Sequence, residues 1–221
     1  SFNLANLDKA VEETEGTSKK TKSKSKSRSK SKKGDDEEKA EFPKGLRFEL
    51  EITRAQFCEK KKDIDGMIKA LTASLEFAKK SSEKARIHFI LGQLYEGKGD
   101  RGQASEHYGK ALKYNGGYEM NFNARLKRAL NGGSSDVEQE LNKMLRDAKN
   151  AEFKDQIYYT LGLIAQNEGD ENQALEKFTS SAFYSTNNNR QKGMSYERLG
   201  DIYFTKKDYV RAQKYYDSCA T

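Results

Sequence analysis

The chain has 221 residues, a hydrophobic fraction of 34%, one proline and no tryptophan. This composition suits a helical protein with a thin, quasi-linear core better than a compact globular one, and strands are not expected. The formal net charge of +7 is concentrated in one place, because residues 19–33 carry eight Lys and one Arg without an acid. Everything outside this run is close to neutral, so the body of the chain has no evident basic face for nucleic acid.

Residues 1–41 form a low-complexity segment in which Ser alternates with Lys before an acidic run, Asp35 to Glu38. We expect this segment to be disordered, because it has too few apolar side chains to offset roughly 1–2 kcal/mol of backbone entropy per residue. It is either a solvated linker or a means of adhesion to an anionic surface such as a membrane, peptidoglycan or nucleic acid. No aromatic residue interleaves with the lysines, so any binding to nucleic acid would be nonspecific.

From Phe42 onward the apolar residues recur with a helical period, which predicts an all-α fold of about five stacked helical hairpins over residues 42–221. A longer turn is expected at Asn131, Gly132 and Gly133. The chain stops without a C-cap or a capping helix, so we expect a fragment of a longer array. The predicted helices are 45–61 and 64–80, 82–97 and 101–114, 118–130 and 136–148, 152–167 and 171–184, and 191–205 and 208–220.

A motif occurs three times: a Leu-Gly pair, a residue three places later, an Asp about eight places after the Gly, then an Ala and an aromatic residue one turn apart. This motif resembles that of the tetratricopeptide repeat, so we expect the hairpins of residues 42–221 to form a tetratricopeptide-like solenoid. The Gly at the crossing lets two antiparallel helices approach, and Gly-Asp pairs such as Gly99 and Asp100 predict a C-cap followed by an N-cap. The residues predicted to pack within the repeats are Leu91, Gly92, Tyr95, Ala104, Tyr108, Ala111, Leu161, Gly162, Ala174, Phe178, Leu199, Gly200, Tyr203, Ala212 and Tyr216.

Catalytic and metal-binding patterns are missing from the sequence. His88 and His107 have no acidic or Cys partner at metal-ligand spacing, and we interpret them as packing or surface residues. Cys58 and Cys219 lie far apart without CxxC or Cys/His company, which predicts buried free thiols. We therefore expect no enzyme activity, no cofactor, no metal and no small-molecule substrate.

A binding surface remains, and the first helices of the hairpins should line it as a groove. Chaperone-tail clamps use Lys, Asn and Arg at fixed positions of these helices, and here only Arg198 fits, so that class is disfavoured. A mixed aromatic and polar groove suits a helix or an extended segment of a partner. The candidate partner-binding residues are Phe89, Gln93, Phe122, Arg125, Tyr159, Leu163, Tyr196, Glu197 and Asp201.

Several stretches carry a closer resemblance than the generic repeat. Over residues 46–221 the chain resembles the periplasmic lipoproteins of the Bacteroidota type IX secretion and gliding machinery, the PorW (SprE) family. The run through FNARLKRAL and KMLRDAKN is the most specific, because it falls where the repeat consensus is weakest. The stretches are KARIHFILGQLYE (84–96), YEMNFNARLKRAL (118–130), LNKMLRDAKNAEFKDQIYYTLGLIA (141–165), QKGMSYERLGDIYF (191–204) and AQKYYDS (212–218).

The resemblance implies a non-catalytic adaptor in the periplasm, associated with the outer membrane through a lipid anchor, that couples the secretion motor and ring to the translocon. Its partners would be motor, ring and translocon subunits. This chain shows no signal peptide or lipobox Cys, and the Lys/Ser run is not expected of the family. The alternative hypothesis is an anionic-surface or nucleic-acid binding protein that acts through residues 19–33, with the repeats as a partner-binding module.

Overall fold

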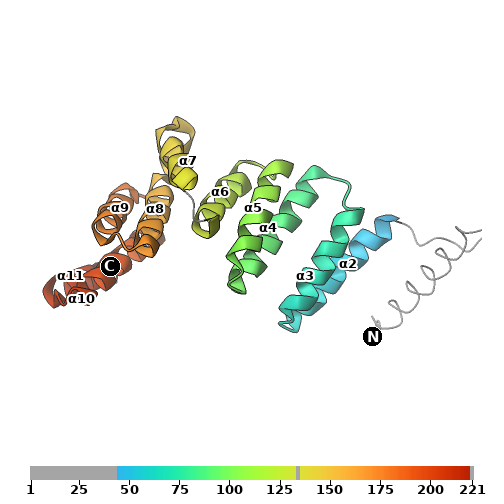
Figure 1. Ribbon diagram of the computed structural model, residues 1–221, viewed down its shortest axis with the longest axis horizontal. Coiled ribbons are helices and arrows are strands. Elements are labelled where there is room, and N and C mark those ends of the chain that lie inside the picture. Colours follow the sequence, from blue (N-terminus) through green and yellow to red (C-terminus); the bar gives the residue numbers. More distant parts are fainter. Residues whose placement is uncertain (1–43, 133–134, 220–221) are drawn as a thin grey trace, which may run out of the picture. The chain divides into compact units, whose positions relative to one another are not determined.

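The computed structural model describes residues 44–132 and 135–219, which hold ten α-helices, one 3₁₀ helix and no strand. The helices pair in chain order as hairpins (Figure 1), which confirms the predicted all-α fold of stacked, tetratricopeptide-like pairs. The segment predicted to be disordered, 1–41, lies outside the described residues.

The described helices belong to two units. The first unit, up to Ala78, contains α2 (Lys44–Lys60) and α3 (Ile64–Phe77). The prediction of one repeat domain over 42–221 stays a prediction. The second unit, from Lys79, contains α4 (Ser81–Gly97), α5 (Arg101–Tyr114), α6 (Tyr118–Gly132), α7 (Ser135–Arg146), η1 (Ala148–Phe153), α8 (Lys154–Glu168), α9 (Glu171–Tyr184), α10 (Asn189–Thr205) and α11 (Tyr209–Cys219).

Most helix boundaries lie within one or two residues of the predicted ones, and three features differ. Helix α3 ends at Phe77, because Ala78 adopts an extended conformation. Helix α6 continues through Asn131 to Gly132, where a turn was predicted, and the Asn131 side chain donates a hydrogen bond to the Lys127 carbonyl one turn earlier. The 3₁₀ helix η1 was not predicted at all.

Four turns within hairpins share one construction: a residue with positive φ ends the turn, and an Asp then begins the next helix. Each Asp side chain accepts a hydrogen bond at 2.9–3.1 Å from the backbone N–H three residues later, which satisfies one of the unpaired donors of the helix N-terminus. The four pairs are Lys62 and Asp63, Gly99 and Asp100, Gly169 and Asp170, and Lys207 and Asp208.

The two helices of each motif-bearing hairpin meet where a glycine faces an aromatic ring. A Cβ placed on Gly92 would lie 2.7 Å from the ring of Tyr108, and one on Gly162 would lie 2.7 Å from the ring of Phe178. Real Cβ atoms do not approach a carbon this closely, so each ring occupies the space that a side chain would need. The glycine is therefore required by packing rather than by its backbone angles.

Neighbouring hairpins of the second unit share their cores. Ala124 of α6 packs in one cluster with Ala104, Tyr108 and Ala111 of α5. A second cluster joins α6, α7 and α8, and a third joins α8, α9 and α10. Each cluster thus includes residues of the helix that follows its hairpin, as expected for repeats that cannot bury an apolar face alone.

The third hairpin, α6–α7, is held differently, because α6 has no glycine before Gly132 at which α7 could approach closely. Besides the core that the two helices share, η1 supports this hairpin. The Tyr118 hydroxyl lies 2.8 Å from the Lys149 carbonyl oxygen and 2.6 Å from Asn150 Oδ1. Asn150 is buried and donates to the Met144 carbonyl. The unpredicted 3₁₀ turn therefore ties the start of α6 to the end of α7.

A buried polar network joins α8, α9 and α10. The Asp155 carboxylate accepts hydrogen bonds from Asn188 at 3.0 Å and Ser185 at 3.4 Å, while the Asp155 carbonyl accepts one from Ser181. The hydroxyls of Ser181 and Ser195 lie 2.8 Å apart. Each of these side chains has a hydrogen-bond partner, so the network orients the three helices relative to one another.

The two cysteines are free, but neither is buried as predicted. Cys58 is half-buried, and a Cβ added to Gly66 would lie 2.7 Å from its Sγ. Cys219 is exposed. The sequence argument rested on the spacing of the cysteines, which says nothing of their burial. Cys219 lies on α11, which among the described residues packs against α10 alone, and this leaves its other side open.

Candidate protein-binding surface

A hollow of about 310 Å³ lies where α4, α6 and α8, the first helices of three successive hairpins, run past one another. We refer to it as the inter-hairpin hollow. Its wall comes from the C-terminal turns of α4, α6 and α8 together with the first residue of α5. The lining residues are Glu96, Gly99, Arg101, Leu130, Asn131, Leu163 and Asn167.

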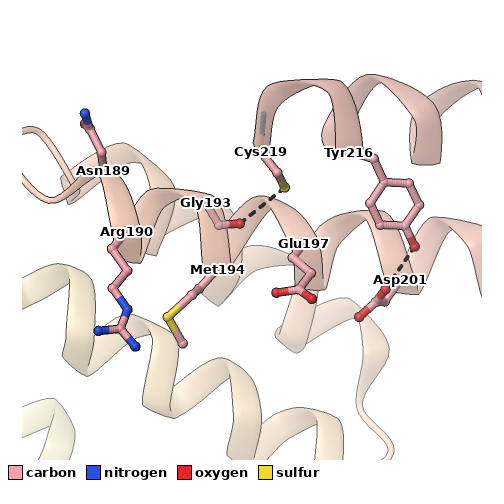
Figure 2. Close-up of a pocket in the computed structure, with 8 residues that line it drawn as sticks. All are labelled: Asn189, Arg190, Gly193, Met194, Glu197, Asp201, Tyr216 and Cys219. Atoms are coloured by element: carbon pink, nitrogen blue, oxygen red, sulfur yellow. Dashed lines mark hydrogen bonds between the residues drawn. The ribbon is translucent and has the colours of Figure 1, made fainter. Parts of the chain in front are cut away.

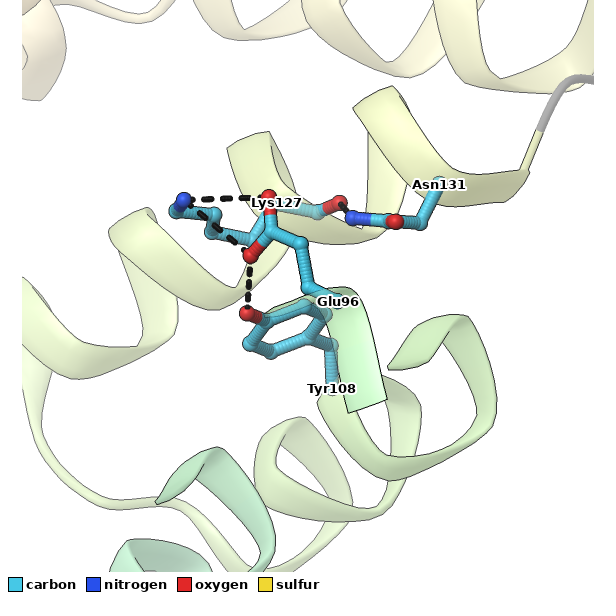
Figure 3. Close-up of polar contacts among 4 residues, drawn as sticks. All are labelled: Glu96, Tyr108, Lys127 and Asn131. Carbon is cyan, nitrogen blue, oxygen red and sulfur yellow. Dashed lines mark hydrogen bonds and ion pairs between the residues drawn. The ribbon is translucent and has the colours of Figure 1, made fainter. Parts of the chain in front are cut away.

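One carboxylate in this wall is fixed by groups from two neighbouring helices (Figure 3). Glu96 accepts a hydrogen bond from the Tyr108 hydroxyl at 2.7 Å and pairs with Lys127 Nζ of α6 at 3.1 Å. Tyr108 is fully buried, and burial together with the carboxylate raises its pKa well above the usual range. The phenol therefore remains a donor, and Glu96 is held in one orientation at the edge of the hollow.

The remaining side chains of the hollow offer complementary kinds of contact. Leu130 and Leu163 are partly buried and provide apolar surface. Asn131 and Asn167 carry amides, each with donors and an acceptor, and one donor of Asn131 is used by the Lys127 carbonyl. Arg101 adds a positive charge beside the negative charge of Glu96. Such a mixture can bind a peptide backbone and one or two side chains.

A second hollow, of about 520 Å³, lies between α10 and α11 (Figure 2). The Tyr216 hydroxyl donates to Asp201 Oδ1 at 2.9 Å, and the Cys219 thiol donates to the Gly193 carbonyl at 3.3 Å. Burial and the nearby carboxylates, Glu197 and Asp201, raise the pKa of the Cys219 thiol. This hollow is larger but rests on one hairpin only, whereas the inter-hairpin hollow joins three, so we place the candidate binding site in the latter.

The structure distributes the predicted partner-binding residues over several places. Leu163 lines the inter-hairpin hollow, and Glu197 and Asp201 line the α10–α11 hollow. Gln93 is exposed on α4, and Phe89 is half-buried with its ring edge against Tyr108.

Four other predicted residues are engaged within the protein. Phe122 is 3% exposed and Tyr159 is 9% exposed, so both belong to the core, where a partner cannot reach them. Tyr196 packs against Tyr215. Arg125 is exposed, but its guanidinium lies 3.5 Å from Glu140 of α7 and is directed to the hairpin partner. The helical period placed these side chains on one face without showing which neighbour covers them.

The residues predicted to pack within the repeats differ in how far the structure buries them. Leu91, Gly92, Ala104, Tyr108 and Ala111 are all buried, as are their counterparts Leu161, Gly162, Ala174 and Phe178, and also Leu199, Gly200 and Ala212. The exceptions are Tyr95 and Tyr203, which are half-buried, and Tyr216, which is 37% exposed.

Sequence reasoning missed Glu96, Arg101, Leu130, Asn131 and Asn167. A signal for Glu96 was present, because it follows Gly92 by four residues and thus lies one turn along the same helix face. Asn131 was assigned to a turn and so was not considered for a helix face. Arg101 and Asn167 lie at helix ends, where only the stacking of hairpins decides which side chains meet.

Within the described residues, no three metal-ligating side chains gather at one place. None of the described helices combines the length and the apolar character that crossing a lipid bilayer requires.

Two segments of the chain match the family model of the tetratricopeptide repeat, residues 85–118 and 195–221. These segments correspond to the α4–α5 and α10–α11 hairpins. No curated protein matches the chain in sequence.

Several solved structures share the fold. MamA residues 41 to end from Desulfovibrio magneticus align with a TM-score of 0.55 at 16% identity, covering 80% of this chain and 96% of MamA. PilF of Pseudomonas aeruginosa aligns with a TM-score of 0.52 at 20% identity, covering 80% and 77%. BtubC from P. vanneervenii aligns with a TM-score of 0.56 at 16% identity, covering 98% and 88%. At these identities the likeness shows a common fold.

Proposed function

We propose that this chain is a non-catalytic scaffold that binds an extended segment of a partner protein in the inter-hairpin hollow. Its matched repeats and its fold are those of a tetratricopeptide repeat protein. Repeats of this kind generally serve as surfaces for other proteins, and the catalytic patterns sought in the sequence are missing. The observation that carries the proposal is the meeting of apolar, amide and charged side chains from three hairpins in one hollow.

The chemistry of the hollow favours an extended segment over a helix. A helix already pairs its backbone N–H and C=O groups internally, so it would offer no backbone partners to the amides of Asn131 and Asn167. An extended segment presents backbone N–H and C=O groups that must find partners when they leave water. The amides of Asn131 and Asn167 can pair with them, and Leu130 and Leu163 can cover a partner side chain.

The experiment is photocrosslinking in cells from position 131, in the full-length protein, with a matched photoreactive residue at Lys113 as the control. Lys113 is exposed on α5 and does not line the hollow. We expect a specific protein to be captured from position 131 and not from position 113. When the photoreactive residue is placed at an adjacent site instead, capture of the same protein should fall if Asn131 and Asn167 are both changed to Ala. Equal capture from both positions, or capture unaffected by the two substitutions, contradicts the proposal.

We further propose that the scaffold works in the periplasm, at the outer membrane, as an adaptor between the motor or ring and the translocon of type IX secretion. The support is the sequence resemblance over residues 84–96, 118–130 and 141–165. The same crosslink tests it: motor, ring or translocon subunits among the captured proteins support the adaptor. Capture of unrelated proteins would remove this assignment and leave the binding site in the hollow intact.

The alternative, binding to an anionic surface, rests on the nine cationic residues of the 19–33 run. Deleting residues 19–33 separates the two functions. The scaffold predicts that partner capture survives the deletion and depends weakly on salt. The alternative predicts near-total loss of binding and a steep decrease with salt, because neutralising many anionic groups releases their counterions.

A further inference from the structure

The two histidines of the chain, distant in sequence, form a buried pair between α4 and α5. His88 Nδ1 and His107 Nδ1 lie 3.0 Å apart, and the two residues are 6% and 8% exposed. A hydrogen bond between two imidazole nitrogens requires one to carry the proton and the other to accept it. The contact therefore exists only while at least one ring is neutral. If both rings were protonated, two N–H donors and two positive charges would face each other.

Two tyrosines enclose the pair. Tyr114 stacks on His88, with ring centroids 5.5 Å apart and planes within 4°, and Tyr95 stacks on His107 at 5.3 Å. The Tyr114 carbonyl accepts a hydrogen bond from Ser81 at 2.6 Å, which joins the start of α4 to the end of α5. The two histidine rings are tilted by 44° with centroids 5.2 Å apart, so the four rings form one continuous row of contacts across the hairpin. Both imidazoles are buried in this row, which shields them from the water that a charged imidazole would need.

The charges around the pair also oppose its protonation. Lys84 of α4 and Lys110 of α5 act against a charge on His88, whereas Glu106 of α5 favours one and is itself paired with Lys110 at 2.6 Å. Burial is the largest cause, and it lowers the pKa of His88 to about 4 and the pKa of His107 below its ordinary value.

Helix α6 also packs against α5, and its Lys127 pairs with Glu96. The charged groups that act on the two histidines are Lys84, Glu106 and Lys110. The cations that act on the histidines therefore come from α4 and α5 themselves.

The chain contains its own comparison for this stack. Counted from Gly92, His88 corresponds to Tyr196 of α10, and counted from Tyr108, His107 corresponds to Tyr215 of α11. Tyr196 and Tyr215 also contact each other, with ring centroids 6.1 Å apart, and Tyr203 stacks on Tyr215 at 5.5 Å as Tyr95 stacks on His107. Three of the four rings are thus arranged alike in the two hairpins, once with two histidines, whose ordinary pKa is about 6.5, and once with two tyrosines, whose ordinary pKa is about 10.

We propose that the His88–His107 pair is an acid-sensitive latch, which holds the α4–α5 hairpin closed near neutral pH and loosens it as the pH falls. His107 directly precedes Tyr108, whose hydroxyl fixes Glu96 at the inter-hairpin hollow (Figure 3). Loosening the hairpin therefore disturbs the binding surface as well. This second consequence rests on the proposed function, whereas the latch itself does not.

The direction of the effect follows from the two states. In the unfolded chain a histidine takes up its proton near pH 6.5, whereas in the folded hairpin His88 does so only near pH 4. Between these values the unfolded state binds more protons, so the folding stability of the hairpin falls as the pH falls. The contribution is complete above about pH 6.5, is lost progressively below it, and changes no further below about pH 4.

Two measurements on the full chain test the latch. The first is a proton NMR titration of the imidazole signals, in which only this pair contributes because the chain has two histidines. The second is hydrogen exchange of the α4–α5 amides relative to the α10–α11 amides, corrected for intrinsic rates. From about pH 7 to about pH 5 we expect the relative protection of α4–α5 to fall roughly tenfold. The imidazoles should titrate below their ordinary pKa.

The matched variant is the double substitution His88→Tyr and His107→Tyr, which installs the residues of the α10–α11 stack. It should remove the pH dependence while preserving protection near neutral pH. If this variant does not fold, the titration of the wild-type protein decides alone. Two independent titrations near the ordinary histidine pKa, or an equal pH response in the double variant, would overturn the latch. A working latch without an effect on partner capture at position 131 would instead contradict the assigned binding site.

Discussion

The α4–α5 and α10–α11 hairpins are built on the same plan and differ in what covers them. In both, a glycine of the first helix lies against an aromatic ring of the second: Gly92 against Tyr108, and Gly200 against Tyr216, where a Cβ would lie 2.5 Å from the ring. Tyr108 is fully buried, because α6 packs beside it, whereas Tyr216 is 37% exposed. The motif therefore fixes how two helices meet, and the neighbouring hairpin decides whether the meeting point becomes a core.

The polar atoms of the two tyrosines show the same contrast. Tyr108 donates to Glu96, which is also held by Lys127 of the next hairpin, so the bond belongs to an interface between repeats. Tyr216 donates to Asp201 within its own hairpin, at the edge of the α10–α11 hollow. A hydrogen bond with a charged partner stabilises more when both groups are shielded from water.

The largest difference is expected when the aromatic side chains are removed. Tyr108→Ala should lower the free energy of unfolding by about 3–5 kcal/mol, because it leaves a cavity in a closed core. Tyr216→Ala should lower it by about 1 kcal/mol, because much of that ring is already in contact with water. Urea denaturation of the full chain followed by circular dichroism measures both. Equal losses for the two variants would show that the covering helix contributes nothing.

A smaller difference is expected from adding one methyl group at the crossing. Gly92→Ala forces the fully enclosed Tyr108 ring to move and should destabilise the fold by about 1–3 kcal/mol. At Gly200 the Tyr216 ring can swing outward, and the better helix propensity of Ala, about 1 kcal/mol, should leave the stability almost unchanged. The control is Gly102→Ala on the exposed face of α5, where the nearest atom would be 3.7 Å away. Gly102→Ala should not destabilise, and a loss as large as that of Gly92→Ala would refute the packing argument.

The smallest difference is expected at the helix caps, which are local and should not sense the neighbouring hairpin. Asp100 accepts a hydrogen bond from Gln103 N–H at 3.0 Å, and Asp208 accepts one from Arg211 N–H at 3.1 Å. Substitution of either Asp by Ala should cost about 1 kcal/mol, and substitution by Asn should cost little, since Asn caps equally well. The same denaturation measurements apply. A cost at Asp100 several times that at Asp208 would mean that capping is coupled to stacking.

Local chemistry made much of the fold predictable. The spacing of Gly92 and Tyr108, the Gly-Asp turns and the helical period identified the hairpins, because each of these signals acts within a single hairpin. The predictions were wrong where a contact with another part of the chain determined the local structure. Residues 148–153 adopt a 3₁₀ helix because Tyr118, about 30 residues away, binds Lys149 and Asn150. Helix α6 passes through Asn131 because a hydrogen bond to Lys127 supports its last turn.

The candidate site was less predictable, because the helical period assigns a residue to a face and says nothing of the neighbour on that face. Phe122 was expected to reach a partner but lies in the core shared by α6, α7 and α8. His88 and His107 were interpreted separately, although their offsets from Gly92 and Tyr108 place both at the crossing of one hairpin. These offsets, compared between repeats, are a signal in the sequence that pairs the two histidines.

The sequence by itself determined most of the helices and most of the turns between them, since these depend on interactions within a hairpin. Only the tertiary structure decided that Glu96 is fixed from α5 and α6, that three hairpins enclose a hollow, and that two histidines share one hydrogen bond. Each of those features joins residues from different helices. Their positions follow from the packing of helices against one another, which no short sequence pattern specifies.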